Sequence, residues 1–229
     1  MGSESQFQIP VIELPIESED LRRGTDKWQS LCRRGRTLTQ SLIMDTMNRV
    51  ANSFLSMKAL DLKMPPTVTL SKASPSLCGL MAMITAGYPT VGLPHTDKFY
   101  GALLCEDRIS GLEIETKDGQ WVKLFPSPGS FVFIVGDLLT TWSNGRMHAA
   151  KHRVMMSGDK DRYSLGAFAV PVEDTIIRAP REMVDEEHPQ VFKGFDLMDF
   201  LNYADSEESM AIDSSKKLFI FAAQPKRVV

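Results

Sequence analysis

The stretch LEIETKDGQWVKLFPSPGSFVFIV, residues 112–135, decides the fold class, because short apolar or alternating pieces are separated by turn residues. Apolar and polar residues alternate over 112–116, which is the period of a strand with one buried face. The KDG tripeptide at 117–119 is a hairpin turn signal, and 121–125 returns along it. The apolar run 131–135 suits a strand buried on both faces. Short strands between Gly and Pro turns predict a sandwich, jelly roll or barrel rather than a parallel α/β sheet.

The rest of the chain adds strands and two helices to this pattern. Apolar pieces predict strands at 80–84, 102–104 and 162–170, and an edge strand with flanking prolines at 7–16. The apolar stripe after Thr37 predicts a helix over 37–60, and a second helix is expected over 196–203. The segment 65–79, rich in Pro, Ser and Thr, is expected to be a loop.

Composition excludes several classes of partner and location. The 229 residues are 43% hydrophobic and 24% charged, which is ordinary for a globular protein. A net charge of −3 argues against nucleic-acid binding, which needs a clustered basic face. Three scattered cysteines fit a reducing compartment, and neither a signal peptide nor an apolar run of membrane-spanning length is recognisable. We therefore expect a cytoplasmic protein that does not bind membranes and acts as a monomer.

A candidate metal site is formed by three residues that lie far apart in the sequence. His95 and Asp97 are separated by one residue, so on an extended segment both side chains point to the same side. His152 adds a second imidazole. Two histidines and one carboxylate can cover one face of an octahedral metal and leave the other positions open, which suits Fe(II) oxygen chemistry. A zinc site would more often have four protein ligands or three histidines.

A candidate anion cradle follows His152 in the sequence. Arg162, Ser164, Gly166 and Phe168 share one face of the strand expected at 162–170. A guanidinium and a hydroxyl on that face can hold a carboxylate. Positive charge close to a cationic metal is favourable mainly when a dianion bridges the two, so the pattern predicts a small dicarboxylate ligand.

These motifs together resemble a known family. His95-Thr96-Asp97, Asn144-Gly145-Arg146, His152-Arg153-Val154 and Arg162-x-Ser164 look like the iron- and 2-oxoglutarate-binding signature of plant 2-oxoglutarate/Fe(II)-dependent dioxygenases. The stretches DGQWVKLFPSPGSF (118–131) and REMVDEEHPQVFKGFD (181–196) are similar to the branch that contains the glucosinolate side-chain dioxygenases. The resemblance extends from about residue 80 to residue 221.

The resemblance implies a fold, a reaction and a set of ligands. The expected fold is mainly β with flanking helices around a double-stranded β-helix (jelly roll) core. Iron would be held by His95, Asp97 and His152, and 2-oxoglutarate by Arg162, Ser164 and Tyr88. With Fe(II), 2-oxoglutarate and O₂, and with ascorbate as an optional reductant, the protein would oxidise a small organic substrate of plant specialised metabolism or a hormone-like molecule. The reaction would be a hydroxylation, a dealkylation or a desaturation, and it would release succinate and CO₂.

The region ahead of His95 departs from the family pattern. Residues 1–79 are expected to be a shortened N-terminal helical region with an edge strand, and 80–229 the dioxygenase jelly-roll domain with a C-terminal helix. Two alternatives therefore stay open. One is a truncated, catalytically impaired paralogue that acts as a non-catalytic binding or regulatory protein. The other is a jelly roll that holds zinc or no metal. Phe168 is equally suited to a pocket wall and to the core, and His148 is expected in a loop.

Overall fold

A computed structural model describes most of the chain after residue 74. The described segments are 75–85, 93–106, 109–126, 130–155, 162–172 and 174–224. The strand predicted at 7–16, the helix predicted at 37–60 and Tyr88 lie outside the described residues. The division into 1–79 and 80–229 stays a prediction, because most of the first region is not described.

Strands dominate the described part of the chain, as the turn pattern predicts. The strands are β1 (Pro75–Thr85), β2 (Gly101–Glu106), β3 (Leu112–Glu115), β4 (Trp121–Lys123), β5 (Val132–Val135), β6 (His152–Val154), β7 (Arg162–Pro171), β8 (Ile176–Ile177) and β9 (Phe195–Asp196). The strands predicted between 80 and 170 are thereby confirmed. The loop interpretation of 65–79 is wrong over 75–79, because β1 begins at Pro75 and is paired along its length with β7.

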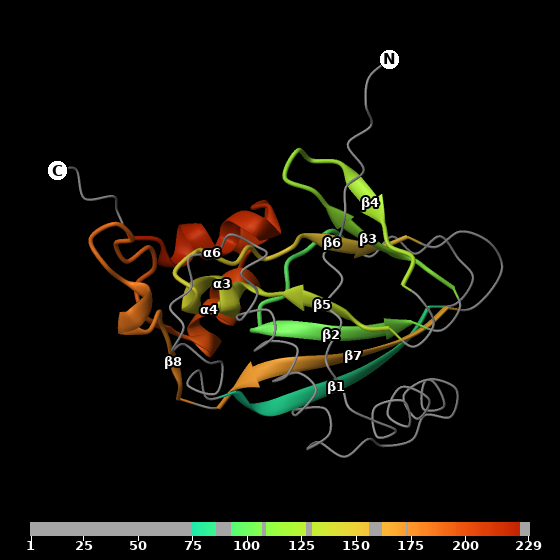
Figure 1. Ribbon diagram of the computed structural model, residues 1–229, viewed down its shortest axis with the longest axis horizontal. Helices are drawn as coiled ribbons and strands as arrows, with labels where there is room; N and C mark the ends of the chain where they lie inside the picture. Colours follow the sequence, from blue (N-terminus) through green and yellow to red (C-terminus); the bar gives the residue numbers. More distant parts are fainter. Residues whose placement is uncertain are drawn as a thin grey trace.

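The strands form two larger antiparallel sheets and one small one (Figure 1). The first sheet has the order β1-β7-β2-β5, the second β4-β3-β6, and β8 pairs with β9. The turn between β3 and β4 contains Gly119 with a φ of +80°, a conformation that glycine adopts without a steric penalty. The KDG hairpin turn predicted from the sequence is therefore confirmed.

The two larger sheets share a small apolar core. Ala102 and Ile134 of the first sheet and Leu112 of the second are at most 1% exposed and belong to one cluster. Phe168 of β7 packs against this cluster, which fits the core alternative for that residue. Burying apolar side chains from both sheets fixes which faces of the strands are turned inward.

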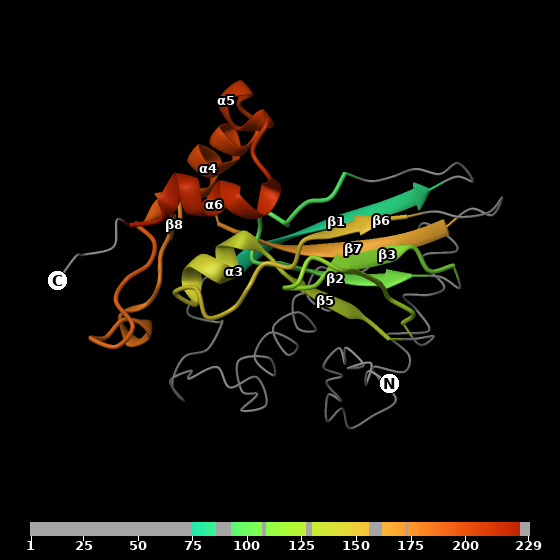
Figure 2. The same cartoon turned by 90° about the horizontal axis from the view of Figure 1, so that it is seen from above.

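Helices gather at one end of the strands (Figures 1 and 2). They are α3 (Asp137–Trp142), the 3₁₀ helix η3 (Arg181–Met183), α4 (Leu197–Ala204), α5 (Glu207–Met210) and α6 (Ser214–Ala222). The helix predicted over 196–203 is confirmed as α4, and the Asp196 side chain caps it by accepting a hydrogen bond from the Met198 N–H. Within the described segments, no helix has the length and apolar character needed to cross a membrane.

The larger core lies where these helices meet the first sheet. Leu138 and Trp142 of α3, Phe200 of α4 and Leu218 of α6 are at most 3% exposed and pack in one cluster with Leu103 of β2. Neither α3 nor α6 was expected from the sequence, because each is stabilised by burial against distant parts of the chain. Hydrogen bonds to Asp137 of α3 and Ser214 of α6 hold the segment around residue 97 against these helices.

Candidate metal centre

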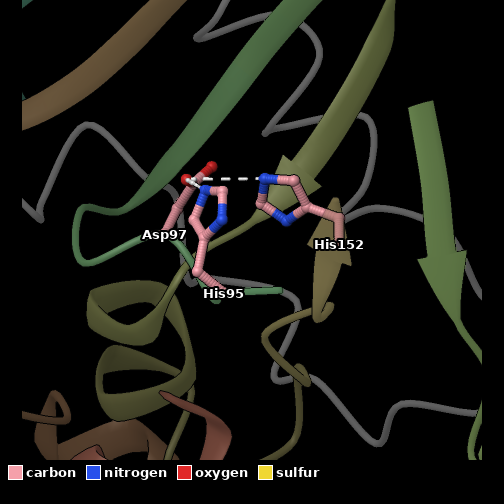
Figure 3. Close-up of side chains that lie close together, drawn as sticks. All are labelled: His95, Asp97 and His152. Carbon is pink, nitrogen blue, oxygen red and sulfur yellow. Dashed lines mark ion pairs between the residues drawn. The ribbon is translucent and has the colours of Figure 1, made fainter. Parts of the chain in front are cut away.

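His95, Asp97 and His152 meet at one point, as the sequence predicts (Figure 3). His95 and His152 form an isolated antiparallel bridge in which each backbone N–H donates to the other residue's carbonyl, at 3.0 and 2.9 Å. Side chains of such a directly opposed pair lie on the same side of the two strands. The imidazole ring centroids are consequently 4.4 Å apart. Asp97, two residues beyond His95, points to the same place.

The ligand atoms are spaced for one metal ion. The Asp97 Oδ1 lies 3.8 Å from the His95 Nε2 and 3.7 Å from the His152 Nε2. One ligand atom from each residue lies within 4.8 Å of the others. Three ligands on one face of an octahedron with bonds of about 2.1 Å would be roughly 3 Å apart, so a small inward movement of each side chain suffices.

Backbone carbonyls orient both imidazoles for metal binding. The His95 Nδ1 lies 2.8 Å from the Leu93 carbonyl oxygen, and the His152 Nδ1 lies 3.0 Å from that of Ala150. A neutral imidazole that donates from Nδ1 leaves the lone pair of Nε2 free, and this arrangement is usual for histidine ligands. Burial lowers the pKa of His152, and the Asp97 carboxylate opposes that shift. The neutral, ligating form of His152 is thereby favoured.

One oxygen of the Asp97 carboxylate has no hydrogen-bond partner among the described residues, and this supports a cation at the site. The Asp97 side chain is 9% exposed, and its Oδ2 has no hydrogen-bond partner among the described residues. A buried carboxylate oxygen without a donor is costly unless a cation or a ligand group compensates. The His95 side chain is 51% exposed, so one side of the group is open. The donor set and the orphaned oxygen both suit a metal with open positions.

A polar cluster anchors the segment that carries the candidate ligands His95 and Asp97. The Lys98 ammonium donates to the Asp137 Oδ2 at 2.7 Å, the Thr96 hydroxyl at 2.9 Å and the Ser214 hydroxyl at 3.1 Å. The Asp137 backbone N–H also donates to the Asp97 carbonyl oxygen at 2.8 Å. Burial raises the pKa of Asp137, and the charge and hydrogen bond of Lys98 oppose this. The cluster joins the residues around Asp97 to the starts of α3 and α6.

The structure also brings together the two residues of the predicted anion cradle. The Arg162 guanidinium, whose side chain is 2% exposed, donates to the Ser164 hydroxyl at 2.9 Å. Gly111 makes room for it, because a Cβ added there would lie 3.0 Å from the Arg162 Cδ and 3.1 Å from Nε. Gly111 also accepts a backbone hydrogen bond from Met155 at 2.8 Å, just past the end of β6, whose first residue is His152. The cradle and the candidate metal ligands are thus connected through β6.

Glu106 is the residue of this region that sequence analysis missed. Its carboxylate forms an ion pair with the Arg162 guanidinium, and its side chain is only 5% exposed. Glu106 lies directly opposite Ser164 in the pairing of β2 with β7, so its side chain is on the cradle face. The signal for Glu106 in the sequence is weak. It follows the apolar piece 102–104 and Cys105, but the residue that it faces on the neighbouring strand cannot be read from the sequence.

Asn144 and Arg146, which belong to the quoted motif, support the scaffold instead of lining the site. The Asn144 amide group donates to the carbonyl oxygens of Met183, His188 and Pro189, at 3.2 to 3.3 Å, and its Oδ1 accepts from Val191 N–H at 2.8 Å. Arg146 donates to the Met183 carbonyl oxygen at 2.8 Å. His148 is exposed and lies in a loop, as predicted.

Two histidines and one carboxylate that meet at one point on antiparallel sheets are typical of facial-triad metal proteins. Residues 85–171 match the model of the 2OG-Fe(II) oxygenase superfamily. The family resemblance expected from the motifs is confirmed.

Proteins from Arabidopsis thaliana are similar to the matched region. The chain is 44% identical over 129 residues to Probable 2-oxoglutarate-dependent dioxygenase AOP1.2, covering 56% of this chain and 40% of that protein. It is 40% identical over 131 residues to 2-oxoglutarate-dependent dioxygenase AOP3, covering 56% of this chain and 32% of that protein. The chain therefore spans well under half the length of these relatives.

Solved structures of the same class share the fold. The dioxygenase for auxin oxidation in rice superposes with a TM-score of 0.63 at 31% identity, over 80% of this chain and 60% of that one. JOX2, crystallised with 2OG, Fe and JA, gives a TM-score of 0.62 at 19% identity, over 81% of this chain and 55% of that one. The second likeness bears on the fold alone.

Proposed function

We propose that this chain is an Fe(II)- and 2-oxoglutarate-dependent dioxygenase that oxidises a small organic molecule. The observation that carries the proposal is the convergence of His95, Asp97 and His152, with their ligand atoms within 4.8 Å of one another. The three residues are assigned as the iron ligands. The orphaned Oδ2 of Asp97 and the two carbonyl-oriented imidazoles support this assignment.

We assign the co-substrate to the anion cradle that Arg162 and Ser164 of β7 form. Arg162 and Ser164 would hold the distal carboxylate of 2-oxoglutarate, while its keto acid end would reach the iron. Fe(II) held by His95, Asp97 and His152 would supply the oxidative decarboxylation of 2-oxoglutarate by O₂, which yields succinate and CO₂ as the substrate is oxidised. The chain's own contribution is to orient the ligands through Leu93 and Ala150 and to bury the cradle away from water.

The substrate class rests on the relatives. AOP3 and AOP1.2 are named as 2-oxoglutarate-dependent dioxygenases, and the similar rice enzyme is a dioxygenase for auxin oxidation. A plant specialised metabolite or hormone-like molecule is therefore the substrate class that we propose. We further propose that the two larger sheets are the halves of a double-stranded β-helix. The cytoplasmic location and the monomeric state stay predictions.

A spectroscopic experiment tests the function directly. Purified protein is mixed anaerobically with Fe(II) and then with 2-oxoglutarate, and the weak visible charge-transfer band of the chelated complex is recorded. The wild type should develop the band, whereas Asp97→Ala should lose both the band and most of the bound iron. Arg162→Ala should weaken 2-oxoglutarate binding far more than iron binding. A folded wild-type protein that binds iron but never develops the band would contradict the proposal.

A second candidate is a protein that keeps the site without turnover. One relative, 43% identical over 124 residues, is named Probable inactive 2-oxoglutarate-dependent dioxygenase AOP2. Within this chain, the ion pair between Glu106 and Arg162 favours this candidate, because it occupies a guanidinium that the co-substrate needs. Release of succinate coupled to oxidation of an added substrate would eliminate it. Unchanged metal content in Asp97→Ala would instead indicate a structural metal or zinc site elsewhere.

A further inference from the structure

We infer that Glu106 is a built-in competitor of the co-substrate, whose carboxylate occupies the Arg162 guanidinium and must give way when a keto diacid binds. The inference rests on the proposed function, because it assumes that Arg162 receives the distal carboxylate of 2-oxoglutarate. Its basis is the direct ion pair between the two side chains, which are 5% and 2% exposed. The consequence is an affinity for 2-oxoglutarate that this one residue sets.

The sheet register places Glu106 in the cradle. Glu106 of β2 is paired with Ser164 of β7, and Arg162 lies two residues before Ser164 on the same strand. Directly opposed residues and residues two apart on a strand share one face of the sheet. The carboxylate therefore approaches the guanidinium from the same side as the Ser164 hydroxyl, which is the side assigned to the ligand.

Contacts other than Glu106 fix the position of Arg162. Its guanidinium donates to the Ser164 hydroxyl at 2.9 Å, and its aliphatic stem passes so close to Gly111 that a Cβ there would be 3.0 Å from Cδ. The Met155 carbonyl oxygen would lie 3.1 Å from the same Cβ, so the space beside Gly111 is filled. Since these contacts do not involve Glu106, the guanidinium should stay in place when that carboxylate is neutralised or withdrawn.

The pair is also incompletely satisfied for a purely structural ion pair. Neither the Arg162 Nε nor the Glu106 Oε2 has a hydrogen-bond partner within the described segments, although both atoms are buried. A buried ion pair offsets its desolvation only when the remaining donors and acceptors are also engaged. In Arg162 the Nε donor is open while the two terminal nitrogens are engaged. This arrangement is expected of a site that exchanges one carboxylate for another.

Charge explains why the two carboxylates compete. One guanidinium can neutralise one carboxylate, and a second carboxylate placed beside Glu106 would be a like charge in a site that excludes water. Bound 2-oxoglutarate therefore displaces Glu106 from Arg162 and leaves a buried carboxylate without its cation. Both effects raise the dissociation constant of 2-oxoglutarate and leave that of Fe(II) unchanged.

Two neutral variants test this competition. Glu106→Gln keeps the shape and an acceptor oxygen, and Glu106→Met keeps only the length. Each variant is loaded with Fe(II) anaerobically and titrated with 2-oxoglutarate and, separately, with pyruvate, a keto acid that lacks the distal carboxylate. The visible band or calorimetry gives the dissociation constants, and circular dichroism confirms that each protein is folded.

Competition predicts that both variants bind 2-oxoglutarate at least about tenfold more tightly than the wild type, equivalent to roughly 1.4 kcal/mol. Pyruvate and Fe(II) affinities should change by less than about twofold. Binding of 2-oxoglutarate by the variants alone supports the competition, and it then favours the second candidate, a protein without turnover, over the active dioxygenase.

Three results would overturn the inference. The first is unchanged or weaker 2-oxoglutarate binding by folded variants that bind Fe(II). The second is an equal gain for pyruvate, which would mean a general loosening of the pocket. The third is unfolding of both variants, which would make Glu106 a structural partner of Arg162. If the wild type and both variants bind Fe(II) but none binds 2-oxoglutarate, the proposed function itself fails, and this outcome is distinct from the other three.

Discussion

Replacing Asp137 with Asn should destabilise the fold and weaken the candidate metal site at the same time. The Asp137 side chain is 2% exposed and its Oδ2 lies 2.7 Å from the Lys98 Nζ, which is itself 18% exposed. Breaking a fully buried ion pair costs about 3–5 kcal/mol, but Lys98 reaches water in part, so we expect a loss of about 2–3 kcal/mol for Asp137→Asn. Lys98→Met should cost a similar amount, because it strands the buried carboxylate.

The double variant isolates the interaction energy between Asp137 and Lys98. Asp137→Asn combined with Lys98→Met removes both charges, so its loss should be smaller than the sum of the single losses by about 2 kcal/mol. Urea unfolding followed by fluorescence measures these differences, and the buried Trp142 at the end of α3 is a suitable reporter. Co(II) titration should show roughly tenfold weaker binding in Asp137→Asn, since the cluster supports the segment that carries Asp97.

An exposed lysine provides the matched control. Lys216→Met removes the same charge from the exposed surface of α6 and should change stability by less than about 0.5 kcal/mol. Strictly additive losses for Asp137→Asn and Lys98→Met, together with an unchanged Co(II) affinity, would refute the argument that this ion pair supports the metal-binding segment.

Three further changes test other parts of the structure. Asn144→Ala should lower the free energy of unfolding by about 3 kcal/mol, because buried carbonyl groups lose their donor and alanine is strained at a φ of 53°; a loss below about 1 kcal/mol in urea unfolding would contradict this. The ion pair with Lys151 holds the pKa of Asp213 at about 2, below its ordinary value, so its stabilisation is present above pH 4 and disappears as the pH falls through 2. Asp213→Asn, which can still cap α6, should therefore be about 0.5 kcal/mol less stable at pH 7 and no less stable near pH 2, whereas Asp213→Ala should lose about 1 kcal/mol more at both pH values. Gly111→Ala should push the Arg162 stem aside and weaken 2-oxoglutarate binding at least several-fold without changing Fe(II) affinity; calorimetry showing equal losses for both ligands would point to a general disruption.

The sequence by itself determined the local structure and the chemistry of the site. Alternation over 112–116 and the KDG turn depend only on neighbouring residues, and they appear as β3 and the hairpin to β4. The spacing of His95 and Asp97 places both side chains on one side of an extended segment wherever that segment lies in the fold. The residue types likewise favour a metal that accepts imidazole and carboxylate ligands at the candidate site.

Only the tertiary structure decided which distant residues face one another. His152 reaches His95 through a two-residue bridge, and Glu106 reaches Arg162 through the pairing of β2 with β7. Such a register is selected by the burial of whole strand faces, which involves residues far apart in the chain. The helix α3 is also stabilised by the core that its leucines enter, and its local sequence was not enough to predict it. The periodicity of apolar residues depends only on a segment and its neighbours in the sequence. The pairing of strands is selected because it lowers the free energy of the whole chain.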